Sequence, residues 1–255
     1  PCLPCFDREP DRHIMSTLFI SDIHLSAQRP DMTAALVRFL EHDAPGADAL
    51  YVLGDLFEFW IGDDDPNPLH QQMADAFLAL SQQNVPIYFI HGNRDFLLGQ
   101  QFAKRAGMTL LGDPCVIDLY GERVVLSHGD LLCTLDEGYQ KFRRITQLKW
   151  LRWLFLRLPL ARRQAIACKM RGQSQMENAH KSQIIMDVTP AAVDDTLRAH
   201  DCRMMIHGHT HRPAIHDFTL DGHPARRIVL GDWFEQGSVL VCRPGEQRLE
   251  QRALI

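Results

Sequence analysis

Five short stretches of this sequence carry side chains that could bind metal ions. Each combines carboxylate, amide or imidazole groups, which are the donors that hard and borderline divalent cations accept in proteins. One such stretch alone is typical of a turn or of a structural histidine. Together they predict a single metal centre, and they are Asp22-Ile23-His24, Gly54-Asp55, Gly92-Asn93-Arg94-Asp95, His128-Gly129-Asp130 and Gly208-His209-Thr210-His211.

The spacing within these stretches favours two metals rather than one. Asp22 and His24 are two residues apart, as are His209 and His211, and on an extended chain such side chains point the same way. The carboxylate of Asp55 has two oxygens and could bridge two cations. Two metals roughly 3.5–4 Å apart can clamp a phosphoryl group and lower the pKa of a bound water towards about 7, so that a bridging hydroxide is the nucleophile. The expected ligands are Asp22, His24, Asp55, Asn93, His128, His209 and His211.

Apolar runs of strand character precede these donors, and helical patterns lie between the runs. The strands are expected at 17–21, 49–53, 87–90, 124–127 and 204–206, and the helices at 31–42, 68–83, 99–106 and 190–200, with Asp31 as an N-cap. Two further strand patterns, 227–230 and 237–242, follow without a helix between them. The alternation predicts an α/β fold with a mixed sheet or two packed sheets flanked by helices. Loops at the strand ends would then converge on one crevice.

The 255 residues suit one large domain or one domain with an insertion. Met15 precedes the first strand pattern, so we interpret Pro1–Ile14 as a tail or an added segment outside the fold. The seven cysteines are odd in number and scattered, which favours reduced thiols in the cytosol. No apolar run reaches the roughly 18 residues that a membrane span needs.

A basic and apolar segment lies between the His128 and His209 motifs. Residues 138–176 contain ten Lys and Arg and no Asp or Glu, which leaves the rest of the chain near −15 against a net charge of −5. Within it, Leu148–Leu160 predicts an amphipathic helix that Pro159 ends or kinks, with a second helix from Leu160. Such a segment suits an anionic membrane surface or an acyl-chain pocket, although a helix simply packed on the core is the alternative. Nucleic acid would explain the charge but not the aliphatic surface.

Arg94 restricts the bond that such a site would break. An arginine stays protonated and cannot act as a general acid. An alkoxide leaving group needs a proton, whereas a phosphate monoester, with a second pKa of about 6, does not. Arg94 therefore favours cleavage of a diphosphate, where it would stabilise charge on the phosphoryl oxygens. The alternative is that Arg94 only pairs with Asp95 or another carboxylate.

The order D-x-H, G-D, G-N-x-D, H-G-D, G-H-T-H resembles the calcineurin-like metallophosphoesterase superfamily, in which many members have His where this chain has Arg94. The likeness is closer to one branch, the hydrolases of UDP-linked diacylated glucosamine in lipid A biosynthesis. It runs from Met15 nearly to the C-terminus, and its strongest stretches are 19–25, 51–58, 60–64, 91–97 and 207–213.

The resemblance implies a two-sheet αββα sandwich over 15–255, with a helical cap inserted at about 136–185. It assigns one metal to Asp22, His24, Asp55 and His211, the other to Asp55, Asn93, His128 and His209, and manganese as the metal. It also implies catalytic roles for Asn93, Arg94 and His209, and substrate contacts from Asn93, Arg94, Asp136, Ser174, Asn178, Lys181 and His209, with Tyr139 as a weaker candidate.

The implied reaction is attack on the α-phosphorus, which gives UMP and 2,3-diacylglucosamine 1-phosphate. The implied location is the cytosolic face of the inner membrane of a Gram-negative bacterium, with peripheral attachment. Two alternatives stay open: a soluble nucleotide or protein phosphatase with the same dinuclear centre, and a non-catalytic interaction module on this fold. Such a module would be expected to have lost metal ligands, and this chain keeps all seven.

Overall fold

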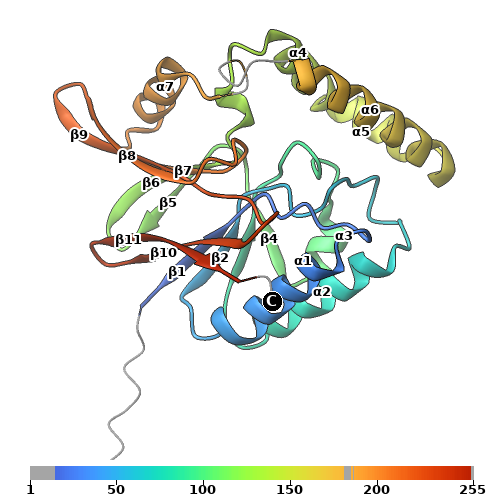
Figure 1. The fold of residues 1–255 in the computed structure, drawn as a ribbon, viewed down its shortest axis with the longest axis horizontal. Coiled ribbons are helices and arrows are strands. Elements are labelled where there is room, and N and C mark those ends of the chain that lie inside the picture. The colour runs from blue at the N-terminus through green and yellow to red at the C-terminus, as the bar shows by residue number, and fades with distance from the viewer. Residues whose placement is uncertain (1–14, 181–184, 186, 254–255) are drawn as a thin grey trace, which may run out of the picture.

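Two β-sheets form the centre of the fold in the computed structural model (Figure 1), which describes residues 15–180, 185 and 187–253, and only the backbone of 173–180. The first sheet has six strands in the order β11-β10-β1-β2-β3-β4, and the second has five in the order β5-β6-β7-β9-β8. Strands β1 to β4 are parallel, while β10 and β11 add antiparallel pairs. The predicted α/β fold with two mixed sheets is confirmed.

The strands of the first sheet are β1 (Thr17–Ile20), β2 (Ala49–Val52), β3 (Ile87–Phe89), β4 (Met108–Leu110), β10 (Gly237–Arg243) and β11 (Glu246–Arg252). Those of the second are β5 (Cys115–Leu119), β6 (Glu122–Ser127), β7 (Met204–His207), β8 (Ala214–Leu220) and β9 (His223–Val229). The helices are α1 (Pro30–Arg38), α2 (Pro68–Ser81), α3 (Gln100–Arg105), α4 (Glu137–Thr146), α5 (Lys149–Leu156), α6 (Leu160–His180) and α7 (Pro190–His200).

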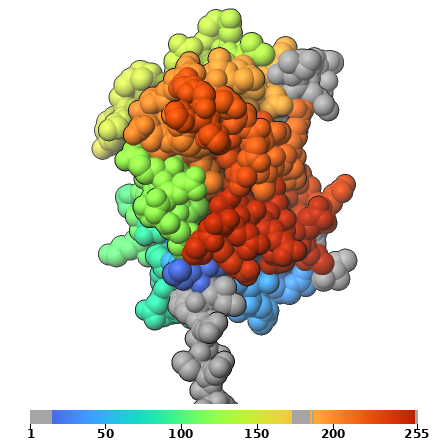
Figure 2. Space-filling model, turned by 90° about the vertical axis from the view of Figure 1, so that its left-hand side faces the viewer, coloured from blue at the N-terminus to red at the C-terminus, as the bar shows by residue number. Residues whose placement is uncertain are grey.

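Three apolar clusters hold the layers together. Alternate residues of a strand point to opposite faces, so Leu18 and Ile20 of β1 pack towards α1, α2 and α3, whereas Phe19 packs between the two sheets. The third cluster joins the outer face of the second sheet to α7, and it includes Met205 and Leu197. The layer order is therefore helix, sheet, sheet, helix, and Figure 2 shows the C-terminal strands β10 and β11, in red, below the orange β8 and β9.

One local expectation about the first helix, its N-cap, is wrong. Helix α1 begins at Pro30 with Arg29 as its N-cap residue, because proline lacks the N–H that a cap would satisfy and suits the first helical turn. The carboxylate of Asp31 instead accepts hydrogen bonds from the guanidinium of Arg29, one of them 2.7 Å long. The expected helical stretch 31–42 is confirmed, because α1 passes after Arg38 directly into a π-helical turn over Phe39–Asp43.

Helices α4, α5 and α6 lie outside the four layers, at one end of the sandwich (Figure 1). Helix α5 ends at Leu156 and α6 begins at Leu160, as expected from Pro159 between them. We call these three helices the cap. Among the described residues, no helix combines the length and apolar character that crossing a bilayer requires.

Candidate metal centre

The two sheets bring the five donor stretches to one place. Strands β1, β2 and β3 are followed by Asp22, Asp55 and Asn93, while β6 and β7 of the second sheet are followed by His128 and His209. Parallel strands end at the same edge of a sheet, and the connecting loops meet there. The buried strands thus fix the ends of five loops around one point.

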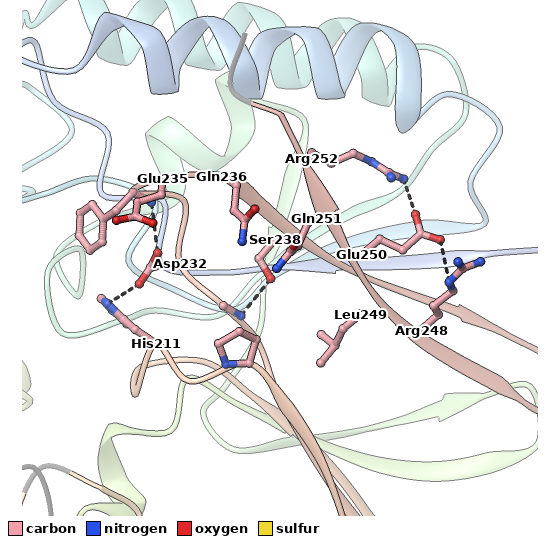
Figure 3. A pocket seen from close by; sticks show the side chains of 13 residues that line it. His211, Asp232, Glu235, Gln236, Ser238, Arg248, Leu249, Glu250, Gln251 and Arg252 are labelled. Atoms are coloured by element: carbon pink, nitrogen blue, oxygen red, sulfur yellow. Dashed lines mark hydrogen bonds and ion pairs between the residues drawn. The ribbon is translucent and has the colours of Figure 1, made fainter.

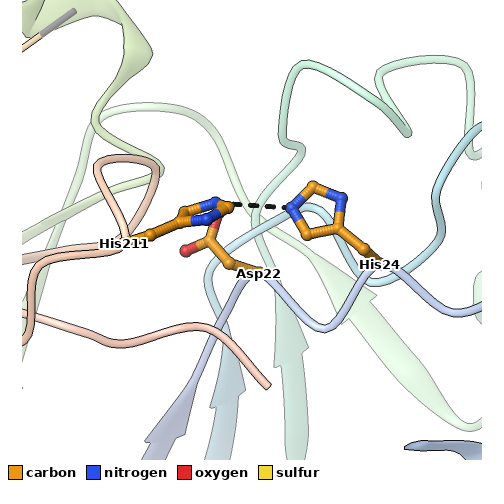
Figure 4. Close-up of side chains that lie close together, drawn as sticks. All are labelled: Asp22, His24 and His211. Carbon is orange, nitrogen blue, oxygen red and sulfur yellow. Dashed lines mark hydrogen bonds and ion pairs between the residues drawn. The ribbon is translucent and has the colours of Figure 1, made fainter. Parts of the chain in front are cut away.

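Asp22, His24 and His211 form the first half of the centre (Figure 4). Their ligand atoms lie within 4.8 Å of one another. The Nε2 atoms of His24 and His211 are 3.4 Å apart, and His211 Nε2 is 3.3 Å from Asp22 Oδ1. Asp22 is fully buried and His24 nearly so. One cation could contact all three side chains.

Asp55 lies between the two halves of the centre. Its Oδ2 atom is 3.7 Å from His24 Nε2 and 3.8 Å from His128 Nε2. Its Oδ1 atom accepts a 2.8 Å hydrogen bond from the backbone N–H of Arg94, which fixes the carboxylate. One oxygen is therefore held by the protein, and the other faces both halves.

Asn93, His128 and His209 form the second half. The Oδ1 atom of Asn93 is 3.0 Å from His128 Nε2 and 3.0 Å from His209 Nδ1. His128 Nδ1 is 2.9 Å from the carbonyl oxygen of Leu53, which can only accept. That contact places the proton on Nδ1 and leaves the lone pair of Nε2 for a cation.

The donor set fits two divalent cations. The buried Oδ1 atom of Asp22 makes no hydrogen bond among the described residues, whereas Oδ2 accepts from Ser21 Oγ at 2.6 Å and from the His209 N–H at 2.9 Å. The one ion-pair contact of Oδ1 among the described residues is His211 Nε2 at 3.3 Å, and a cation between these two atoms would satisfy both. Gly208 allows this arrangement, because a Cβ there would lie 2.3 Å from Asp22 Oδ2.

The electric field of the site also favours cations. Burial alone would lower the pKa of His128, but the charges of Asp55, Asp22 and Asp130 outweigh it and raise that pKa to about 9. A centre that stabilises a proton on a fully buried imidazole would stabilise a metal ion there instead.

The backbone at the ligands is unusual. Five of the seven predicted ligands have a positive φ: Asp22 (55°), His24 (51°), Asp55 (53°), His209 (70°) and His211 (55°). Non-glycine residues rarely adopt this left-handed region, and each instance costs on the order of 1–3 kcal/mol. The strand ends turn sharply in order to aim these side chains inward.

Arg94 makes no ion pair with Asp95, and its positive charge acts on the nearby carboxylate of Glu58. Its buried Nε atom has no hydrogen-bond acceptor among the described residues. Asp95, the alternative partner, accepts instead from the backbone N–H groups of Gly92 (2.8 Å) and Leu56 (2.7 Å). The pairing of Arg94 with Asp95 is therefore not formed.

The other predicted substrate residues are spread along the cap. Asp136 is nearly buried and caps α4 by accepting a 3.0 Å hydrogen bond from the Tyr139 N–H. The Tyr139 ring stacks beside His209 at 6.1 Å between centroids. Ser174 and Asn178 belong to α6 in the part described by backbone alone, and Lys181 lies outside the described residues.

Two carboxylates near the centre were not predicted from sequence as site residues. Glu58 and Asp232 lie behind His24 and His211, at 3.4 and 3.2 Å from the Nδ1 atoms. The sequence holds a signal for Asp232, because 229–232 reads VLGD, as does 52–55. Asp232 also lines a hollow of about 870 Å³ beside His211 (Figure 3).

The arrangement of these side chains agrees with the family to which comparison with known proteins assigns the chain. The chain belongs to the calcineurin-like phosphoesterase family, whose model matches residues 15–213. A solved archaeal phosphodiesterase matches 93% of this chain and 99% of its own, with 12% identity and a TM-score of 0.46. The family model and the groups of candidate metal donors identify the chain as a hydrolase of this family.

Two similar proteins of known name carry the same one. A protein of Aeromonas hydrophila named UDP-2,3-diacylglucosamine hydrolase is 92% identical over 241 residues, which cover 94% of this chain and all of the relative. A protein of the same name from Escherichia coli is 56% identical over 226 residues, covering 89% of this chain and 94% of the relative.

Proposed function

We propose that this protein hydrolyses the diphosphate of UDP-2,3-diacylglucosamine to UMP and 2,3-diacylglucosamine 1-phosphate, a reaction of lipid A biosynthesis. The observation that carries the proposal is the buried, unpaired Nε of Arg94 next to seven convergent metal donors. The names and high identities of the relatives support the choice of substrate.

The residues take roles that follow from their positions. Asp22, His24, Asp55 and His211 would hold one divalent metal, and Asp55, Asn93, His128 and His209 the other, with manganese as the proposed ion. When bound, the metals would supply Lewis-acid stabilisation and a water of lowered pKa. Arg94 would donate hydrogen bonds to the diphosphate, and Asn93 and His209 would lie beside the reacting phosphorus. The departing sugar phosphate needs no proton, which suits a site with arginine at position 94.

The cap supports a lipid substrate. On α5, Leu151 and Phe155 face inward, and Phe155 packs against the apolar cluster of the first sheet. On the same helix, Trp150 and Trp153 are more than half exposed. We propose that the inward side contacts the acyl chains of the substrate. The polar part of the substrate would be bound by Asp136, Ser174, Asn178 and Lys181. The outward side, in a segment without acidic residues, would attach the protein to the cytosolic face of an anionic inner membrane.

Hydrolysis in H₂¹⁸O with manganese tests the reaction. Label in UMP is the expected result, since attack at the α-phosphorus transfers the water oxygen there. Label in the lipid phosphate would contradict this choice of phosphorus, and absence of any turnover would remove the substrate.

Paired variants of α5 test the two sides of the helix. Leu151→Ser with Phe155→Ser should abolish turnover of the lipid in detergent micelles while leaving that of a small phosphate ester. Trp150→Ser with Trp153→Ser should keep lipid turnover in micelles but lose sedimentation with vesicles of anionic phospholipid. The same loss of lipid turnover in both pairs would contradict the division into an inner and an outer side.

A further inference from the structure

Two histidines of the centre have carboxylates behind them. The Nε2 atoms of His24 and His211 face each other across 3.4 Å in the centre. Their Nδ1 atoms point the other way and lie within ion-pair distance of Glu58 Oε2 (3.4 Å) and Asp232 Oδ2 (3.2 Å), although the angle at His24 Nδ1 does not make a hydrogen bond. The second of these contacts is visible in Figure 3. Both rings therefore present one nitrogen to the metal position and the other to a carboxylate.

The other half of the centre is built differently. His128 Nδ1 meets a neutral carbonyl, that of Leu53. Among the residues that the structure describes, no carboxylate lies within ion-pair distance of His209. Among the described residues, a carboxylate at ion-pair distance behind the imidazole ring is thus found for His24 and His211, whereas Asp130 acts on His128 and His209 from farther away.

Each of the two carboxylates is held through its other oxygen. Glu58 Oε1 is 3.1 Å from Arg171 NH2 on α6, so the cap contributes to its position. Asp232 Oδ1 accepts a 3.2 Å hydrogen bond from the Phe234 N–H. The ring of Phe234 then stacks on that of His24, with centroids 5.4 Å apart and planes 11° apart. Each carboxylate therefore has a second contact besides its imidazole.

A carboxylate behind a metal-binding imidazole fixes the tautomer, orients the ring and raises its basicity. We infer that Glu58 and Asp232 are positioning residues that make the metal position of Asp22, His24, Asp55 and His211 the tighter of the two. This inference rests on the proposed dinuclear centre. It adds which of the two metal positions binds its ion more tightly, which the set of ligands alone does not give.

Titration of the metal-free protein with Mn²⁺ tests the inference, with free Mn²⁺ followed by electron paramagnetic resonance. The wild type should show a tight and a weak class of sites. Glu58→Gln and Asp232→Asn keep the side-chain size and remove the charge. Each should weaken the tight class by roughly 10- to 100-fold and leave the weak class unchanged. Circular dichroism like that of the wild type would show that the fold is kept.

Glu235→Gln is the matched control. Glu235 lines the same hollow as Asp232 and is exposed, and no ion pair joins it to a histidine among the described residues. Its variant should titrate like the wild type. Unchanged Mn²⁺ affinity in both Glu58→Gln and Asp232→Asn, or equal weakening of both classes, would overturn the inference alone. Failure of the wild type to bind Mn²⁺ would overturn the proposed metal centre and the inference with it.

Discussion

Replacing Arg163 with methionine should loosen the cap from the rest of the fold. Arg163 belongs to α6, yet its side chain is only 2% exposed. Its guanidinium donates to the carbonyl of Ile61 at 2.6 Å, to that of Leu158 at 3.0 Å and to both carboxylate oxygens of Asp64. It is therefore a direct polar link between the cap and the loop after β2.

The size of the effect follows from the groups left behind. Methionine retains much of the buried chain length but leaves two carbonyls without a donor, each at about 1–3 kcal/mol. Because Asp64 is 63% exposed, water can replace its contact, and it adds little. A loss of about 2–6 kcal/mol in the free energy of cap opening would speed amide hydrogen exchange in α5 and α6 by roughly 30-fold or more.

Hydrogen exchange read by mass spectrometry would measure this change segment by segment. Arg162→Met is the control, because Arg162 is the neighbouring residue, is exposed and carries the same charge. It should leave exchange in the cap unchanged. Equal exchange rates in the two variants would refute the reasoning that Arg163 anchors the cap.

Three further predictions concern the site and its surroundings. Arg94→Met should lower kcat for the diphosphate by roughly 10²- to 10³-fold with metal content unchanged, because charge on the phosphoryl oxygens loses its donor. Gly208→Ala should lower the bound metal measured by elemental analysis, since its Cβ would displace the Asp22 carboxylate. His70→Phe should make the free energy of unfolding fall less between pH 7 and pH 5. Burial lowers the pKa of His70 from 6.5 to about 4, so between these pH values the unfolded chain binds a proton and the folded protein does not. This difference lowers the free energy of unfolding of the wild type by about 2 kcal/mol at pH 5.

Each of these three has a clear contrary result. Loss of metal from Arg94→Met would show that the arginine acts on the centre and not on the substrate. Gly172→Ala, at a helical glycine with open space around it, should keep its metal, and equal loss from it and from Gly208→Ala would remove the steric reason. An identical drop in denaturation midpoint from pH 7 to pH 5 in wild type and His70→Phe would exclude a contribution from His70.

Much of the fold could be predicted from the sequence because its central strands are buried. Runs such as 49–53 and 204–206 are apolar throughout, and only a strand between two layers has both faces covered. The predicted metal-binding side chains come directly after these strands. Their convergence at one place could therefore be predicted from the layered fold. The same reasoning did not find four partly exposed strands: β4 is only three residues long, β5 and β8 are short of buried positions, and β11 is polar at six of its seven residues.

The residues behind the ligands were harder to predict for a different reason. Asp232 reaches His211 only because β9 pairs with β7, a contact set by tertiary structure. Glu58 gains its place from a turn after Asp55 and from Arg171 more than a hundred residues away. Spacing along the sequence predicts which side chains lie together at one strand end. It does not predict contacts between side chains of separate helices, strands and loops.

The left-handed backbone at Asp22, His24, Asp55, His209 and His211 has a consequence for engineering this protein. Glycine or asparagine at such positions relieves conformational strain, so a selection for heat resistance alone would favour replacing these ligands. Thermostable variants obtained without a screen for turnover should therefore accumulate changes at the metal centre. With the metal-binding roles proposed above, stability and catalysis compete at the same five residues, and a library that aims to improve one must hold these positions fixed.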